Sequence, residues 1–178
     1  MRKLAITELN RLTVEDYKKT PKNKIVVVLD NVRSLHNVGS VFRTCDAFCL
    51  EAVYLCGITS TPPHSEIHKT ALGAEDSVDW KYFEKTETAV ESLKKDGYLA
   101  IAVEQTDDSI LLTDFIPDKN QKYALVFGNE VKGVQQSVID LCFRSLEIPQ
   151  FGTKHSLNIS VSAGVVLWEM VKELKIES

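Results

Sequence analysis

The sequence lacks any apolar run that approaches the length of a membrane-spanning helix, which needs about 18 residues or more. Its first 24 residues also contain no apolar stretch of the kind that forms the core of a secretory signal. From these two absences we expect no membrane segment and a cytoplasmic location.

Cysteine and histidine are both scarce, with four of each. Cys45 and Cys49 are four residues apart, which is not the C-x-x-C spacing of a redox pair or a zinc knuckle. His64 and His68 have helical spacing, but Ser65 stands where a zinc protease needs a glutamate. We therefore expect reduced thiols in apolar surroundings, surface histidines and no metal site.

The glycines do not form either of the common nucleotide-binding patterns. Only Gly39 follows the first predicted strand closely, so the G-x-G-x-x-G pattern of dinucleotide folds is missing. Gly128 and Gly133 have the separation of a phosphate-binding loop, but Val134 replaces the lysine that grips phosphate. Ser156 lies beside His155 without the G-x-S-x-G pattern of a hydrolase nucleophile.

Positive charge is in short supply, and it is unevenly spread. The net charge is −4 over 178 residues, yet residues 1–24 hold seven Lys/Arg against three acids. The remainder therefore carries −8. We expect a basic N-terminal arm or helix over residues 1–23, followed by a single domain over 24–178. Such an arm can steer a polyanion, and it can equally be a solvated tail.

Strand-like and helix-like segments alternate along the chain, which predicts an α/β fold with a mostly parallel sheet flanked by helices. The expected strands cover residues 24–30, 52–57, 78–83, 98–105, 122–130 and 145–149. The expected helices cover residues 37–48, 68–72, 87–97, 134–142 and 157–175.

Polar loops follow four of the strands, at residues 30–37, 104–108, 128–133 and 149–158. In parallel sheets ligands bind at the carboxyl ends of strands, so these loops form the candidate site. Asn37 can cap the helix that follows, and Arg43 should lie inside that helix near its apolar face. Taken alone, Arg43 is better interpreted as a surface residue or a member of a structural ion pair than as a functional residue.

Three segments together are more specific than any one of them. Residues 29–48, 125–134 and 148–169 resemble, in order, motifs 1, 2 and 3 of the SpoU/TrmH-type RNA ribose 2′-O-methyltransferases of the SPOUT superfamily. The resemblance runs from about Lys24 to Lys172. The matching residues are Asn37, Gly39, Arg43, Gly128, Asn129, Glu130, Gly133, Ile148, Pro149, Ser156, Leu157 and Asn158.

The resemblance implies a deep C-terminal trefoil knot that holds S-adenosylmethionine, with S-adenosylhomocysteine as the product. It implies cofactor binding by Val103, Glu104, Gln105, Thr106, Gly128, Asn129, Ile148, Pro149, Ser156 and Leu157. It implies catalytic roles for Arg43, Asn37, Ser156, Asn158 and Glu130. Arg43 would orient the RNA phosphate and polarise the 2′-hydroxyl. Glu130 would anchor the motif 2 loop (residues 128–133) or the partner chain of a dimer, or it would act as a base.

Members of this family are homodimers in which the arginine of one chain faces the cofactor pocket of the other. We expect Val161, Val165, Leu167 and Trp168 to form the dimer surface with residues 38–48. Ser160, Ala163 and Gly164 fit a helix that packs closely on neighbouring backbone.

The substrate is less well defined than the reaction. The stretch 103–115 is similar to enzymes that methylate a guanosine ribose in tRNA, which favours tRNA. Ribosomal RNA remains an alternative. The others are a small-molecule methyltransferase and a catalytically silent RNA-binding or scaffold protein on the same fold.

Overall fold

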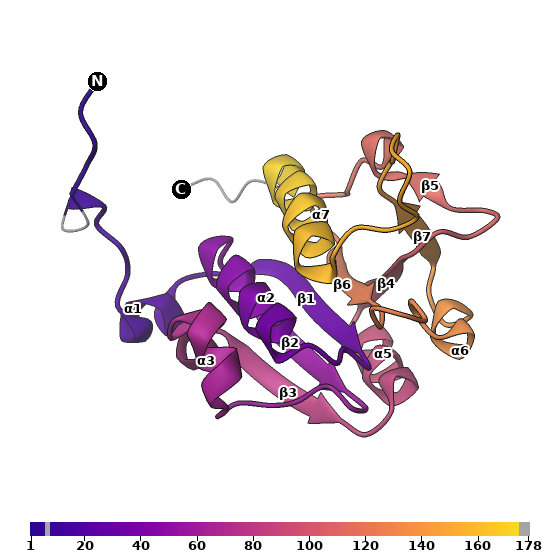
Figure 1. Cartoon of the computed structure of the whole chain (residues 1–178), viewed down its shortest axis with the longest axis horizontal. Coiled ribbons are helices and arrows are strands. Elements are labelled where there is room, and N and C mark those ends of the chain that lie inside the picture. The colour runs from indigo at the N-terminus through magenta and orange to yellow at the C-terminus, as the bar shows by residue number, and fades with distance from the viewer. Residues whose placement is uncertain (6–7, 175–178) are drawn as a thin grey trace.

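The structure, a computed structural model, describes residues 1–5 and 8–174 and contains one seven-stranded sheet (Figure 1). All recorded strand pairs are parallel, and the strand order is β3-β2-β1-β6-β4-β7-β5. The strands are β1 Asn23–Asp30, β2 Leu50–Cys56, β3 Asp79–Phe83, β4 Tyr98–Val103, β5 Ile110–Leu111, β6 Lys122–Phe127 and β7 Arg144–Glu147. The α/β class and the parallel sheet are therefore confirmed. The expected knot stays a prediction.

Helices cover both faces of the sheet. They are α1 Val14–Lys19, α2 Leu35–Ala47, α3 Ser65–Ala71, α4 Ala74–Ser77, α5 Thr86–Lys95, α6 Gln136–Ile139 and α7 Ile159–Leu174, with a short 3₁₀ helix η2 at Leu112–Asp114. On one face α2 packs against α3 and α7, and on the other α5 and α6 pack against the central strands. No helix among residues 1–5 and 8–174 is long and apolar enough to span a membrane.

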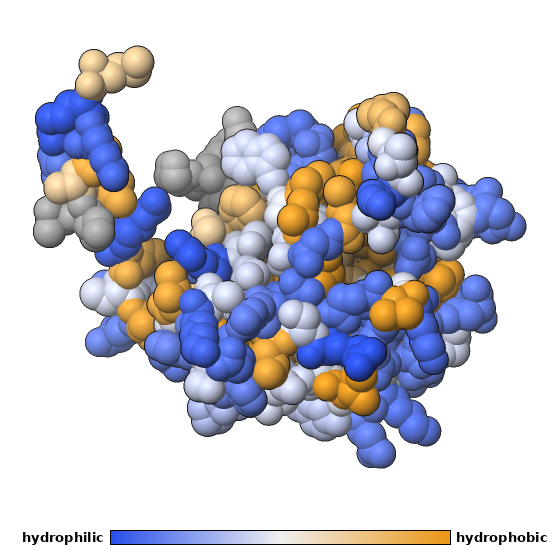
Figure 2. Space-filling model, viewed as in Figure 1, coloured by the Kyte–Doolittle hydropathy of each residue, from blue (hydrophilic) through white to orange (hydrophobic). Residues whose placement is uncertain are grey.

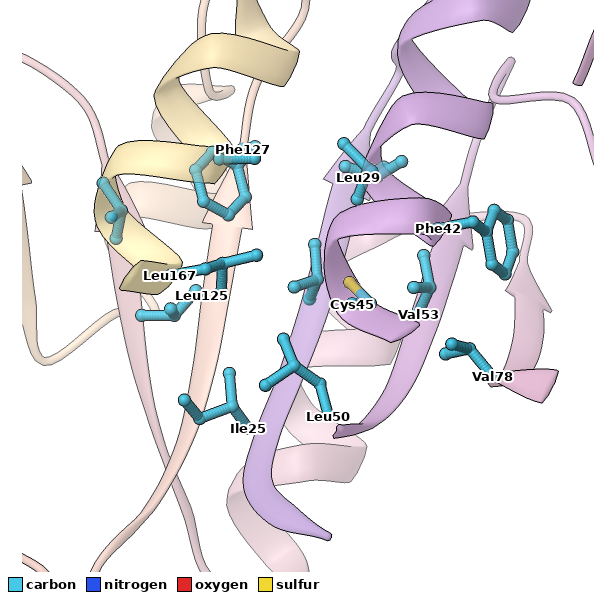
Figure 3. Close-up of a cluster of buried hydrophobic side chains, with 14 of the residues drawn as sticks. Ile25, Leu29, Phe42, Cys45, Leu50, Val53, Val78, Leu125, Phe127 and Leu167 are labelled. Carbon is cyan, nitrogen blue, oxygen red and sulfur yellow. The ribbon is translucent and has the colours of Figure 1, made fainter. Parts of the chain in front are cut away.

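The larger core lies between the sheet and the α2/α7 layer. Figure 3 shows Leu125 and Phe127 of β6 beside Leu167 of α7, with Leu29 of β1 facing α2. Alternate residues of β1, such as Val28, point into the second cluster beneath α5. Because both faces are buried, this central strand is an almost continuous apolar run, as parallel sheets require.

Several predicted boundaries shift in the structure. Ser34 rather than Asn37 caps α2, because its Oγ accepts the N–H of Asn37 at 3.3 Å and the helix begins at Leu35. The helix expected over 134–142 is a single turn, α6, and the one expected at 68–72 becomes α3 and α4. The two-residue strand β5 was not predicted. Of the expected final helix, residue 175 lies outside the described residues.

The N-terminal segment packs against the body through α1. Tyr17 of α1 is buried, and its hydroxyl donates to the carbonyl of Leu50 at 3.3 Å. Residues 8–13 lead away from the sheet (Figure 1). The basic N-terminal arm or helix over residues 1–23 stays a prediction.

Candidate active site

A cleft of about 670 Å³ lies at the carboxyl ends of β4, β6 and β7. These strands are neighbours in the sheet, so the loops that follow them meet at one edge. Phe127 and Leu146 give the cleft an apolar floor, and the half-exposed Leu157 lies at its rim.

Most of the residues expected at the site line this cleft. They are Val103, Glu104, Gln105, Gly128, Asn129, Glu130, Ile148, Ser156, Leu157 and Asn158. Thr106 and Pro149 are not among the lining residues, and Thr106 Oγ1 donates instead to Asp108 at 3.1 Å. Arg43 and Asn37 also lie outside the lining.

Asn37 joins the three motif segments through its side-chain amide. Its Nδ2 donates to Glu130 Oε1 at 3.2 Å, and its Oδ1 accepts from Asn158 Nδ2 at 3.3 Å. Asn158 in turn caps α7, since its Oδ1 accepts the N–H of Ser160 at 2.9 Å. Asn37 therefore links the loop after β6 to the first turn of α7.

Glu130 is fixed at the start of α2. Its carboxylate accepts the backbone N–H groups of Arg33 at 3.1 Å and Ser34 at 3.0 Å, besides the amide of Asn37. Burial alone would raise the pKa of Glu130, but these donors outweigh burial, so its pKa lies below the ordinary value of 4.5. An ionised carboxylate with three donors is an anchor for the motif 2 loop, which is the first of the roles expected for it.

Asn129 holds the same loop from within. Its Nδ2 donates to the carbonyl of Asn31 at 2.7 Å, and its Oδ1 accepts the N–H groups of Val131 and Lys132 at 2.9 and 3.2 Å. The main chain of Asn129 also exchanges two hydrogen bonds of 2.9 Å with Gly133, so the side chain and the main chain of Asn129 both stabilise the turn.

Position 128 requires glycine because the backbone of the same loop packs directly against it. A Cβ on Gly128 would lie 2.1 Å from the backbone of Gly133 and Val134. A larger side chain at position 128 would therefore break the motif 2 turn before it could fill a cofactor slot.

Asp30 and Gln135 were missed as parts of the site's framework. Asp30 is fully buried at the end of β1, and its oxygens accept from Gln135 N at 2.9 Å and Gln135 Nε2 at 2.8 Å. Thr86 Oγ1 also donates to Asp30 at 2.6 Å. The sequence signal that could have identified Asp30 is a carboxylate at the end of a buried apolar strand, because a buried charge needs hydrogen-bonding partners.

Arg43 is exposed on α2, and the expectation that it lies near the apolar face is wrong. Within residues 1–5 and 8–174 no hydrogen bond or ion pair to its guanidinium is recorded. Arg43 is therefore free to meet a group outside its own chain.

In the described part of the chain, no group of three or more His, Cys, Asp or Glu side chains could hold a metal ion. The four cysteines are free thiols. His64 accepts the N–H of Glu66 at 3.1 Å, and His68 pairs with Glu75 at 2.6 Å, so both exposed histidines have local structural partners.

Comparison with known proteins places this geometry in a family. The model of the SpoU rRNA Methylase family matches residues 24–168. The chain belongs to the SpoU rRNA Methylase family. It is therefore a methyltransferase whose methyl donor is S-adenosylmethionine, and the cleft has a volume and an apolar floor that fit that donor.

Similar curated proteins act on two kinds of RNA. The chain is 28% identical to a tRNA (guanosine(18)-2′-O)-methyltransferase of Aquifex aeolicus, covering 84% of this chain and 69% of that protein. It is 32% identical to the 23S rRNA (guanosine-2′-O-)-methyltransferase RlmB of Neisseria meningitidis, covering 82% of this chain and 57% of that protein. The chain thus spans little more than half of the ribosomal RNA enzyme.

Solved structures show the same fold. The TrmH/SpoU tRNA modifying enzyme of A. aeolicus has a TM-score of 0.78 at 25% identity, covering 90% of this chain and 79% of that one. An AdoMet-bound rRNA methyltransferase of Sinorhizobium meliloti also has a TM-score of 0.78 at 25% identity, covering 89% of this chain and 60% of that one.

Glu130→Ala should make stability less dependent on pH in the acid range. The lowered pKa of Glu130 stabilises the folded state above its ordinary pKa of 4.5, and this contribution is lost as pH falls through the lowered value. Because Glu130 is exposed to solvent, which weakens its hydrogen bonds, we expect a loss of about 1 kcal/mol at pH 7, and this loss should become smaller as the pH falls through the lowered pKa. Urea unfolding of both proteins at pH 7 and pH 3.5 measures the difference.

Glu91→Ala, on the exposed side of α5, is the control and should change stability little at either pH. An equal loss for Glu130→Ala at both pH values would contradict the anchoring role.

Proposed function

We propose that the protein methylates the 2′-hydroxyl of a ribose in RNA, with a tRNA guanosine as the favoured target. The observation that carries the proposal is that the amide of Asn37, on α2, joins two segments that line the open cleft and are distant in sequence, the loop after β6 and the start of α7. The curated relatives named as RNA 2′-O-methyltransferases support the reaction class. We also propose the cytoplasm, where such RNA is found, as the location.

The chain's own residues would bind and orient rather than react. S-adenosylmethionine supplies a methyl group on a positively charged sulfur. The main chain near Gly128, Ile148 and Leu157 would hold it over the apolar floor of the cleft. The exposed Ser156, at the mouth of the same cleft, would contact the ribose.

Arg43 would position the RNA. Its planar guanidinium can grip a phosphate and the 2′-hydroxyl together, which lowers the cost of aligning the hydroxyl with the methyl group. Arginine stays protonated near neutral pH, so we assign it charge stabilisation and orientation, with the RNA phosphate as a proton acceptor.

We propose a homodimer with shared sites, in which Arg43 serves the cleft of the partner chain. Val161, Val165 and Trp168 are 51%, 39% and 57% exposed on one face of α7, beside α2. Figure 2 shows hydrophobic side chains at the surface over this helix. Leu167 is fully buried in the core, so its expected place on the dimer surface is wrong.

tRNA and ribosomal RNA remain rival substrates, and relatives of both kinds are similar to the chain. Methyl transfer from labelled S-adenosylmethionine to bulk tRNA and to ribosomal RNA, followed by nucleoside analysis, tests the proposal. 2′-O-methylguanosine in tRNA is the expected product. Binding of cofactor and RNA without any transfer would favour a silent RNA-binding protein, and transfer only to small molecules would overturn the RNA substrate.

Arg43→Ala should leave cofactor binding near normal and lower methyl transfer by about 100-fold, the lower end for a positioned charge-stabilising group. Arg43→Lys should restore little activity, because a point charge cannot form the planar fork. Calorimetry with S-adenosylhomocysteine and the transfer assay measure the two effects.

Mixing Arg43→Ala with Gly128→Val tests whether the site is shared. The second variant should lose cofactor binding through the broken motif 2 turn, so it must first be shown to dimerise. In a mixed dimer with shared sites one site carries both defects and the other carries neither, so activity should return. A mixture as inactive as its parents, despite proven subunit exchange, would contradict sharing.

Gly164→Ala tests the dimer surface separately. The close packing expected around Gly164 is not found within the chain, since an added Cβ meets nothing within 4 Å. In a monomer the change should therefore stabilise α7 by about 1 kcal/mol. If this face is the interface, the dimer should dissociate more readily, which sedimentation measures. A dimer as tight as the wild type would contradict our choice of face.

A further inference from the structure

Two consecutive residues after β4 lie between the other loops of the cleft. In the sheet β4 is flanked by β6 and β7, so the loop that begins at Glu104 lies between the segment after β6 and the segment after β7. Glu104 and Gln105 both line the cleft, and each has a side-chain hydrogen bond to a different neighbouring segment.

Glu104 bonds to the end of the motif 2 loop. Its Oε2 accepts the N–H of Val134 at 2.9 Å, and its Oε1 accepts the N–H of Gln105 at 2.9 Å. Gly133 has φ +68°, and a Cβ there would lie 2.1 Å from Oε2 of Glu104. The carboxylate thus fills a space that only a glycine at position 133 leaves open.

Gln105 forms a hydrogen bond to the motif 3 loop (residues 149–158). Its Nε2 donates to the carbonyl of His155 at 3.1 Å. Residues 151–157 are exposed and form no helix or strand. Within the part of the chain that the structure describes, this is the one recorded hydrogen bond between residues 151–157 and another segment.

We propose that Glu104 and Gln105 are positioning residues, which set the spacing of the three loops around the cofactor cleft instead of contacting the cofactor with their side chains. Glu104 holds the motif 2 loop, and Gln105 holds the motif 3 loop. The idea rests on the proposed function for its cofactor part, whereas the two loop contacts exist without ligand. It assigns to both side chains a role other than the cofactor contact expected from sequence.

The two contacts can be tested separately in the ligand-free protein. Glu104→Ala should speed hydrogen exchange of backbone amides in residues 131–135, because Val134 loses its acceptor. Gln105→Ala should speed trypsin cleavage after Lys154, which precedes His155 in the loop that is released. Each change should leave the signal of the other loop near the wild-type value.

Measuring the binding of S-adenosylhomocysteine tests whether the two loop contacts affect the cleft. This probe lacks the sulfonium charge, so the negative charge of the cleft affects it little. Glu104→Gln keeps one acceptor but turns an amide donor toward a backbone N–H, and we expect about tenfold weaker binding. Glu147→Gln is the matched control, because Glu147 lines the same cleft and bonds instead to Ser109 Oγ at 2.9 Å.

The outcomes separate the alternatives. Weaker binding for Glu104→Gln than for Glu147→Gln, together with the two loop signals, supports the proposal. Equal weakening by both variants would assign the effect to charge and overturn it, as would unchanged exchange and unchanged cleavage. A wild-type protein that binds neither S-adenosylhomocysteine nor S-adenosylmethionine would overturn the proposed function, while the ligand-free measurements would still decide the loop contacts.

Discussion

The geometry of the cleft depends on the side-chain amide of Asn37, which donates to Glu130 and accepts from Asn158. Only an amide offers a donor and an acceptor at one end of a side chain of this length. A carboxylate there would face Glu130 with a like charge, and a leucine would remove both hydrogen bonds. Because Asn37 is buried, the cost of an unmade bond is larger than on an open surface.

Three carboxylates hold the motif 2 loop in place through further hydrogen bonds. Asp30, Glu104 and Glu130 each accept hydrogen bonds from backbone or side-chain N–H groups of this loop or of the segment that meets it. Few apolar side chains anchor the loop, and Val131 is largely exposed. Hydrogen bonds to charged acceptors therefore take the place of hydrophobic packing in holding this loop.

The parallel sheet could be predicted from sequence because each buried strand is a short apolar run between polar loops, and the matching motif residues located the cleft. Details that depend on three-dimensional contacts could not be predicted from the sequence. Ser34 and Asn37 are both good capping residues three positions apart, and the choice fell to Ser34 because Asn37 is engaged by Glu130 and Asn158. Leu167 and Trp168 are adjacent, and only the rotation of α7 against β6 decides which is buried.

The central claim is that the amide of Asn37 holds the loop after β6 and the start of α7 in the arrangement that binds the methyl donor. Calorimetric titration of Asn37→Leu with S-adenosylhomocysteine tests it most directly, with Asn120→Ala on an exposed loop as control. We predict at least about tenfold weaker binding for Asn37→Leu, with a circular dichroism spectrum like that of the wild type, and no change for the control. Wild-type affinity in a folded Asn37→Leu protein would contradict the account.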